Sequence, residues 1–166
     1  MYLKKVISGG QTGADLAGLL AAQAAGLETG GHIPKGFKTE DGPKPSLTKL
    51  GLIETKSSGY EERTGLNVKN SDATIIASMD MSSPGTKMTQ AFCDKYKKPV
   101  AGIRYNNNKE PSIEKTAERL ADWLTHQKVE ILNVAGNRGS KAPGLQYWLV
   151  QVLIMTFTLL KEDNED

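Results

Sequence analysis

Residues able to bind an anion gather in a loop near the start of the chain. The stretch "VISGGQTGADLAGLLAAQAAG", residues 6–26, is an apolar run that leads through glycines into a helical pattern. The loop itself contains Gly9, Gly10, Gln11, Thr12 and Gly13. A helix that begins here directs free N–H groups and the positive end of its dipole at the loop, as in strand–loop–helix units that bind phosphate or carboxylate.

Asp15, just inside this helix, does not suit a plain phosphate site because its charge would repel an anion. We therefore expect Asp15 or Gln11 to contact a sugar or base. The loop matches neither G-x-G-x-x-G nor G-x-x-x-x-G-K-[ST], so neither standard nucleotide fingerprint applies. The alternative is a tight turn without a ligand, in which Asp15 is only a helix-start charge.

Two later loops offer similar groups. The stretch "SSPGTKM", residues 82–88, supplies Gly85 and Thr86, and "VAGNRGSKAPG", residues 134–144, supplies Gly136, Arg138, Ser140 and Lys141. Arginine brings a planar fork of donors and lysine a point charge, and both suit an anionic ligand. The alternatives are a helix cap for the first loop and a solvated loop for the second.

Further candidates lie between these loops. The segment from Gly30 to about Tyr60 reads as a long polar loop, which is usually functional or mobile, and it contributes Lys35. The following segment, residues 59–72, adds Tyr60, Arg63 and Asn67. Arg63 and Asn67 share one face if this segment is a helix, and a base could stack on Tyr60. We expect these groups to make the site locally basic.

Four β-branched apolar runs predict the strands that position the loops: residues 3–8, 73–78, 99–105 and 129–136. Helical patterns cover residues 13–25, 86–97 and 112–125. Strands alternating with helices predict an α/β protein whose parallel sheet has helices on both faces. Because ligands bind at the carboxyl ends of such strands, the three glycine loops should gather at one edge of the sheet.

Composition limits the other possibilities. The 166 residues predict a single domain over 1–160, followed by an acidic tail over 161–166. A net charge of +2 argues against a nucleic-acid polymer as partner, and a single cysteine fits a cytoplasmic protein. No His or Cys spacing predicts a metal site. The apolar stretch 145–160 is too short for a membrane span. Its breadth instead predicts a homodimer or homotetramer.

The motifs "SGGQTGADLAGL", "GGHIPKG", "YEERTGLNVKNSDATIIAS" and "LNVAGNRGSKAPG" resemble the circularly permuted YpsA-like family. This family belongs to the SLOG group, which also contains the LOG phosphoribohydrolases, and its members carry the label of molybdenum cofactor carrier. The resemblance implies a Rossmann-like, doubly wound fold, a ligand site on the glycine loops and an oligomer. It also implies molybdenum cofactor (molybdopterin) or a nucleotide as the bound ligand.

The chain departs from the family pattern at points that bear on function. Pro84 stands where the family tends to have a glycine, and Asn137 where it tends to have proline. LOG enzymes place a catalytic glutamate where this chain has Thr89, which cannot ionise as a carboxylate does. We therefore expect a binding protein for a phosphate-bearing, nucleotide-like ligand and assign no catalytic residue. The alternatives are a LOG-like phosphoribohydrolase and a structural subunit.

Overall fold

The strands of the central sheet are all parallel to their neighbours in the computed structural model, which describes residues 2–163 and 165. They lie in the order β5-β2-β1-β8-β6-β7. Their bounds are β1 Lys5–Ile7, β2 Glu28–Ile33, β5 Leu52–Glu54, β6 Ala73–Ser78, β7 Val100–Arg104 and β8 Ile131–Gly136. Every residue of β6 is buried, which explains why its sequence is apolar without strict alternation.

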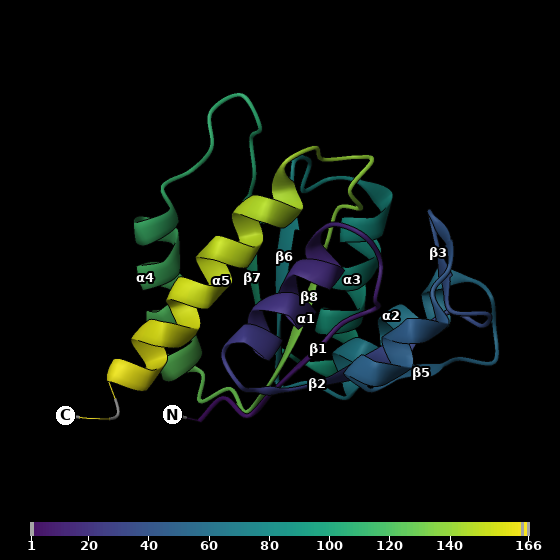
Figure 1. The fold of residues 1–166 in the computed structure, drawn as a ribbon, viewed down its shortest axis with the longest axis horizontal. Helices are drawn as coiled ribbons and strands as arrows, with labels where there is room; N and C mark the ends of the chain where they lie inside the picture. Colours follow the sequence, from purple (N-terminus) through teal and green to yellow (C-terminus); the bar gives the residue numbers. More distant parts are fainter. Residues whose placement is uncertain (1, 164, 166) are drawn as a thin grey trace.

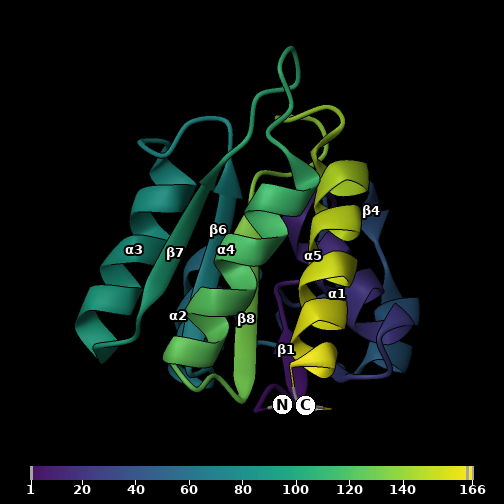
Figure 2. The ribbon, with the colours of Figure 1, turned by 90° about the vertical axis from the view of Figure 1, so that its left-hand side faces the viewer.

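Helices cover both faces of the sheet (Figures 1 and 2). One layer contains α1 (Ala14–Ala24), α4 (Ile113–His126) and α5 (Leu145–Glu162), and the other contains α2 (Tyr60–Lys69) and α3 (Pro84–Tyr96). The predicted α/β class and doubly wound, mainly parallel sheet are therefore confirmed. The chain leaves β1 in one direction through α1 and leaves β6 in the other through α3, so the strand order reverses between them.

The segment expected to be a long loop is more ordered than predicted. It contains the end of β2, a small hairpin of β3 (Lys38–Thr39) and β4 (Gly42–Pro43), the 3-10 helix η1 (Pro45–Leu50), and β5. The prediction was wrong because β2 carries two glycines in place of β-branched residues and β5 is only three residues long. This segment packs on a second apolar cluster, formed by Leu19, Ile33 and Leu52.

Helix α5 explains the apolar C-terminal stretch in part. It packs against both α1 and α4, so its buried stripe is wider than one contact would need. Among its large apolar side chains, Tyr147 and Ile154 stay exposed. The helix ends at Glu162, so the expected tail at 161–166 begins later than predicted; residues 164 and 166 lie outside the described residues. None of the described helices is long and apolar enough to cross a membrane.

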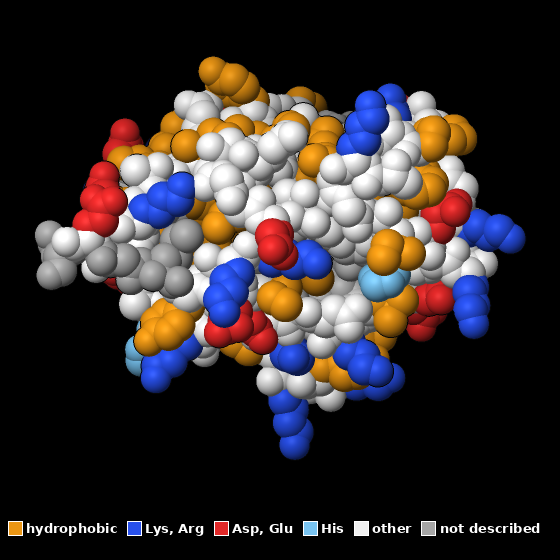
Figure 3. Space-filling model, turned by 60° about the horizontal axis from the view of Figure 1, so that its bottom comes forward, with side chains coloured by type: hydrophobic (Ala, Val, Ile, Leu, Met, Phe, Trp, Pro, Cys, Tyr) orange, Lys and Arg blue, Asp and Glu red, His pale blue; other side chains and the backbone are white. Residues whose placement is uncertain are grey.

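The two ends of the sheet differ in their surroundings. The described ends of the chain lie at the bottom of Figure 1, and the glycine loops lie in its upper half. Figure 3 brings the bottom forward and shows Lys and Arg side chains interspersed with Asp and Glu. Opposite charges mixed in this way create no large field of one sign. A site with charge of one sign is therefore not expected at this end of the sheet, and the glycine loops lie at the opposite end.

Candidate functional site

The loops that follow β1, β6 and β8 enclose a cavity of about 600 Å³ together with α2 and α3. It lies at the carboxyl ends of the strands where the strand order reverses, the usual ligand position in such sheets. The sequence-predicted residues that line it are Gly9, Gln11, Asp15, Tyr60, Arg63, Asn67, Gly85, Thr86, Gly136, Arg138 and Lys141. The predicted gathering of three distant loops around one space is thus what the structure shows.

The N-terminus of α3 forms one wall of the cavity. Ser83 occupies the N-cap position, but its side chain does not cap the helix; its hydroxyl donates to Thr86 Oγ1 instead, at 3.0 Å. The backbone N–H groups of Gly85 and Thr86 have no acceptor among the described residues. A Cβ added to Gly85 would meet nothing within 4 Å. This helix end is therefore open to an anion, since uncapped N–H groups and the dipole favour one.

Cationic side chains surround Tyr60 at the same cavity. Lys38 Nζ, Arg63 Cζ and Arg138 Cζ lie 5.1 to 5.4 Å from the centre of the Tyr60 ring. Lys141 also lines the cavity. Within the described part of the chain, Lys38, Arg138 and Lys141 form no ion pair with an acidic side chain. Their charge is uncompensated at contact distance and attracts an anionic ligand.

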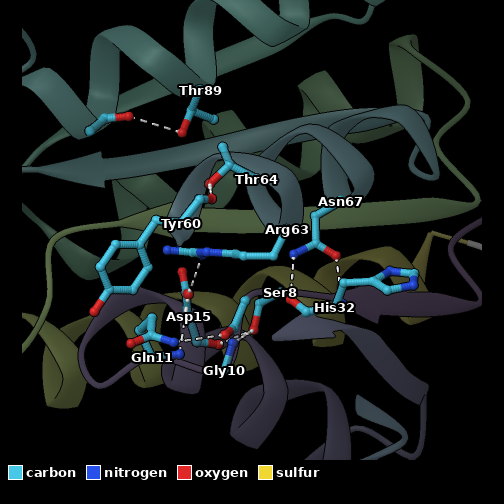
Figure 4. A network of polar contacts seen from close by, with 12 residues as sticks. Ser8, Gly10, Gln11, Asp15, His32, Tyr60, Arg63, Thr64, Asn67 and Thr89 are labelled. Carbon is cyan, nitrogen blue, oxygen red and sulfur yellow. Dashed lines mark hydrogen bonds and ion pairs between the residues drawn. The ribbon is translucent and has the colours of Figure 1, made fainter. Parts of the chain in front are cut away.

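Two opposite charges in the cavity wall, Arg63 and Asp15, offset each other. Arg63 donates from Nη1 to Asp15 Oδ2 at 3.2 Å, and the side chains are only 16% and 4% exposed. The backbone N–H of Gln11 donates to the same oxygen. Figure 4 shows Arg63 extending between Tyr60 and Asn67, above Asp15. Burial raises the pKa of Asp15, and the positive charge of Arg63 opposes this shift.

The expected phosphate cradle in the first loop is already occupied by the chain itself. The Glu40 carboxylate accepts hydrogen bonds from the Thr12 hydroxyl and from the backbone N–H and hydroxyl of Ser140. Gly139 in turn donates its N–H to Thr12 Oγ1 at 3.0 Å. Thr12 and Ser140 therefore lie outside the cavity lining and hold the β3–β4 hairpin against the loops.

Three other predicted residues also lie outside the cavity lining. A Cβ at Gly10 would come within 2.5 Å of Leu52 Cδ2, so this glycine lets the first loop pack on the second apolar cluster. Gly13 faces the backbone of the β8 loop, because a Cβ there would lie 2.2 Å from Asn137 O. Lys35 is exposed and does not reach the cavity. Replacing Gly10 by valine would therefore disturb packing rather than a ligand contact.

Removing the Glu40 carboxylate should loosen the loop contacts. In Glu40→Ala, amide exchange at Ser140 and Gly139 should speed up about threefold to fivefold, a modest change because Glu40 is partly exposed and solvent screens its charge. Asp41→Ala is the matched control, since the Asp41 side chain makes no hydrogen bond or ion pair with another described residue. NMR measures amide exchange at Ser140 and Gly139 in Glu40→Ala and in Asp41→Ala. Equal exchange rates in the two variants would contradict the contact between Glu40 and Ser140.

The same contact should depend on pH. Hydrogen bonds from Ser140 and Thr12 lower the pKa of Glu40 from its ordinary value of 4.5. A carboxyl whose pKa is lowered on folding stabilises the fold above its unfolded pKa, and this contribution is lost as pH falls through the folded pKa. In the wild type, the Ser140 amide signal should therefore change only below pH 4.5.

Several residues that line the cavity were not among the site residues predicted from the sequence. Ile76, Met79, Met88, Val134 and Ala135 give it apolar walls, and Asp80, Asn133 and Asn137 add polar groups. Asn137 Oδ1 accepts from Met79 N at 2.7 Å and from the Ser78 hydroxyl, so it joins the β6 and β8 loops. The sequence shows that Asn137 lies in a glycine-rich loop, but it does not show that its partners are Met79 and Ser78, which are 58 and 59 residues away.

Asn67 lines the cavity but already has partners. Its Oδ1 accepts from His32 N and its Nδ2 donates to His32 O, which fixes α2 to β2. Thr89 also lines the cavity, and its hydroxyl donates to Gly85 O. No group of three or more His, Cys, Asp or Glu side chains suited to a metal ion occurs in residues 2–163 and 165.

Comparisons with known proteins agree with this arrangement. The profile of the circularly permutated YpsA SLOG family matches residues 6–157. A crystal structure of a "putative molybdenum carrier protein" from Syntrophus aciditrophicus SB superposes with a TM-score of 0.85 at 35% identity, covering 93% of this chain and 95% of that one. A search of curated proteins finds no match. The profile spans most of the sequence and includes the loops that form the cavity, so the chain belongs to the circularly permutated YpsA SLOG family.

Proposed function

We propose that this protein binds a small, phosphate-bearing, nucleotide-like ligand in the cavity at the carboxyl ends of β1, β6 and β8. The observation that carries this proposal is the uncapped N-terminus of α3, which opens into the same cavity as the unpaired cations Arg138 and Lys141. Both features favour a negative group, and they come from different parts of the chain. The phosphate binds near Gly85 and Thr86, in the cavity that Arg138 and Lys141 also line.

The size and walls of the cavity support a ligand larger than phosphate alone. A volume of about 600 Å³ falls within the range of about 300–1,000 Å³ usual for small-molecule and cofactor sites. The apolar walls suit a ring system. Molybdenum cofactor is a pterin with a phosphate, so it has both the ring system and the negative group that the cavity favours. The name of the relative from Syntrophus aciditrophicus also favours it as the bound molecule. A nucleotide meets the same requirements.

A binding role agrees with the carboxyl groups at the cavity. Hydrogen bonds from Ser82 lower the pKa of Asp80, so it is ionised near neutral pH and cannot donate a proton, and Asp15 is engaged in an ion pair with Arg63. Thr89 supplies no carboxylate. If chromatography shows that the protein releases free base from nucleoside monophosphates, the LOG-like hydrolase is favoured instead.

We also propose that the protein forms a homodimer or homotetramer in the cytoplasm, with the exposed side chains Tyr147 and Ile154 among the subunit contacts.

The function is tested by thermal shift with nucleoside monophosphates and pterin phosphates. A ligand at 100 times its dissociation constant should stabilise the wild type by about 2.7 kcal/mol. Arg138→Ala should weaken binding by about 1.5–3 kcal/mol if its hydrogen bonds to the phosphate are charge-assisted. Arg119→Ala, an exposed arginine on α4, is the control and should bind as the wild type does. Equal affinity in both variants places the ligand elsewhere.

A further inference from the structure

Two buried polar atoms have no hydrogen-bond partner among the described residues: Gln11 Oε1 and Arg63 Nε. Both side chains line the cavity, and Gln11 is only 2% exposed. Buried polar groups are nearly always hydrogen-bonded in native proteins, so an unpaired acceptor and an unpaired donor in one cavity wall need an explanation. A ligand that supplies the missing donor and acceptor is such an explanation.

The orientation of the Gln11 amide follows from its surroundings. Its Nε2 donates to Gly9 O at 3.1 Å and to Lys38 O at 2.9 Å. A rotated amide would place its oxygen against these two carbonyl oxygens, where no hydrogen is available. The atom without a partner is therefore the oxygen, and this end of the cavity needs a donor from the ligand.

Arg63 provides the complementary group within the same network. Asp15 Oδ2 accepts from both Gln11 N and Arg63 Nη1, so the two residues flank one carboxylate oxygen. The ion pair cancels the charge of Arg63 and leaves Nε as a donor without a partner. A phosphate does not suit this end, because it would face the Gln11 oxygen and the Asp15 carboxylate. A neutral group that offers both a donor and an acceptor does suit it.

We propose that the Gln11–Arg63 end of the cavity is a subsite for the edge of a planar nitrogen heterocycle. An N–H of the ring donates to Gln11 Oε1, and a neighbouring ring oxygen or nitrogen accepts from Arg63 Nε. This inference rests on the proposed function, which places the phosphate beside the N-terminus of α3. Pterins, hypoxanthine, guanine and adenine carry such an edge, whereas unsubstituted purine has acceptors but no donor on its six-membered ring.

Four probes that share a phosphate separate the contributions of the ring. Isothermal titration calorimetry compares IMP, AMP, purine riboside 5′-monophosphate and ribose 5-phosphate. The tighter of IMP and AMP should bind at least about tenfold more strongly than purine riboside 5′-monophosphate, because a site built to hydrogen-bond a group rejects the analogue that lacks it. Ribose 5-phosphate should bind most weakly.

Two charge-conserving variants show which residue causes the preference for IMP or AMP over purine riboside 5′-monophosphate. Arg63→Lys keeps a positive charge beside Asp15 but has no Nε, so it should reduce the preference for the tighter of IMP and AMP over purine riboside 5′-monophosphate. Arg138→Lys leaves the Gln11 and Arg63 side chains unchanged, so it should change all four affinities by the same factor. Thermal unfolding checks that each variant is folded, and the comparison of probes on the wild type needs no variant.

The outcomes separate this inference from the proposed function. If all four probes bind equally well, the phosphate site stands and the ring subsite is wrong. Equal binding of the three ring-bearing probes, tighter than ribose 5-phosphate, indicates apolar contact alone and also overturns the hydrogen-bonding subsite. If none of the four binds, the ring subsite is wrong and a nucleotide is excluded as ligand, whereas the thermal-shift test with pterin phosphates decides the proposed function.

Discussion

Replacing Arg63 by alanine is expected to destabilise the fold by about 3–5 kcal/mol at pH 7, because removing one partner of a buried ion pair leaves an uncompensated buried charge. The Asp15 side chain is only 4% exposed, and the 3.2 Å contact with Arg63 Nη1 is its one ion pair in the described residues. Urea denaturation measures the loss. Arg119→Ala, on the surface of α4, should change stability by less than about 0.5 kcal/mol.

The loss should depend on pH in a defined direction. Burial already raises the pKa of Asp15 above its ordinary value of 3.8, and removing Arg63 removes the main influence that lowers it. A carboxyl with a raised folded pKa destabilises the fold increasingly as pH rises above its unfolded pKa. The deficit of Arg63→Ala should therefore shrink as pH falls from 7 toward 4. A deficit below about 1 kcal/mol at pH 7 would show that the pair behaves as an exposed one.

The second large effect is expected at Gly13. Gly13 and Gly36 have the same positive φ of 84°, and a left-handed conformation costs an alanine about 1–2 kcal/mol. The ψ of −125° at Gly13 lies outside even the left-handed region that an alanine can adopt. A Cβ at Gly36 meets nothing within 4 Å, whereas one at Gly13 would lie 2.2 Å from Asn137 O and 2.8 Å from Gly139 N. Gly36→Ala is thus a control for an alanine at the same φ without a clash.

Gly13→Ala should destabilise the protein by about 3–5 kcal/mol, because the clash adds to the strain and displaces hydrogen bonds worth about 1 kcal/mol each. The contacts at risk are Ala14 N to Asn137 O and Gly139 N to Thr12 Oγ1. The displaced loop carries Arg138, so ligand affinity should fall as well. Equal urea midpoints for the two alanine variants would contradict the close packing of these loops.

Local sequence patterns predicted much of the fold and part of the site. The apolar runs of β6 and β8 and the apolar faces of α1, α3 and α4 are local features, so their periodicity was enough. Because the strands were predicted to be parallel, the three glycine loops were correctly expected to meet at one edge of the sheet. Strands β2 and β5 escaped prediction because glycines and short length remove the pattern.

The rest depended on contacts between distant residues. Glu40 and Ser140 are 100 residues apart, and no spacing in the sequence shows that one carboxylate occupies the hydroxyls expected to bind phosphate. Glycines are likewise ambiguous: Gly10 and Gly13 allow close packing of the chain, whereas Gly85 leaves open space at the cavity. The residue type is the same, and only the surroundings distinguish the roles.

The central claim is that the cavity beside α3 binds a phosphate-bearing, nucleotide-like molecule. Native mass spectrometry of the purified protein, followed by denaturation and analysis of what is released, tests it most directly. The prediction is that the wild type carries a phosphorus-containing ring compound and that Gly85→Val, whose side chain would project into the open space at the α3 N-terminus, does not. Wild-type protein that is bare and stays bare when nucleotides and pterin phosphates are added would contradict the account.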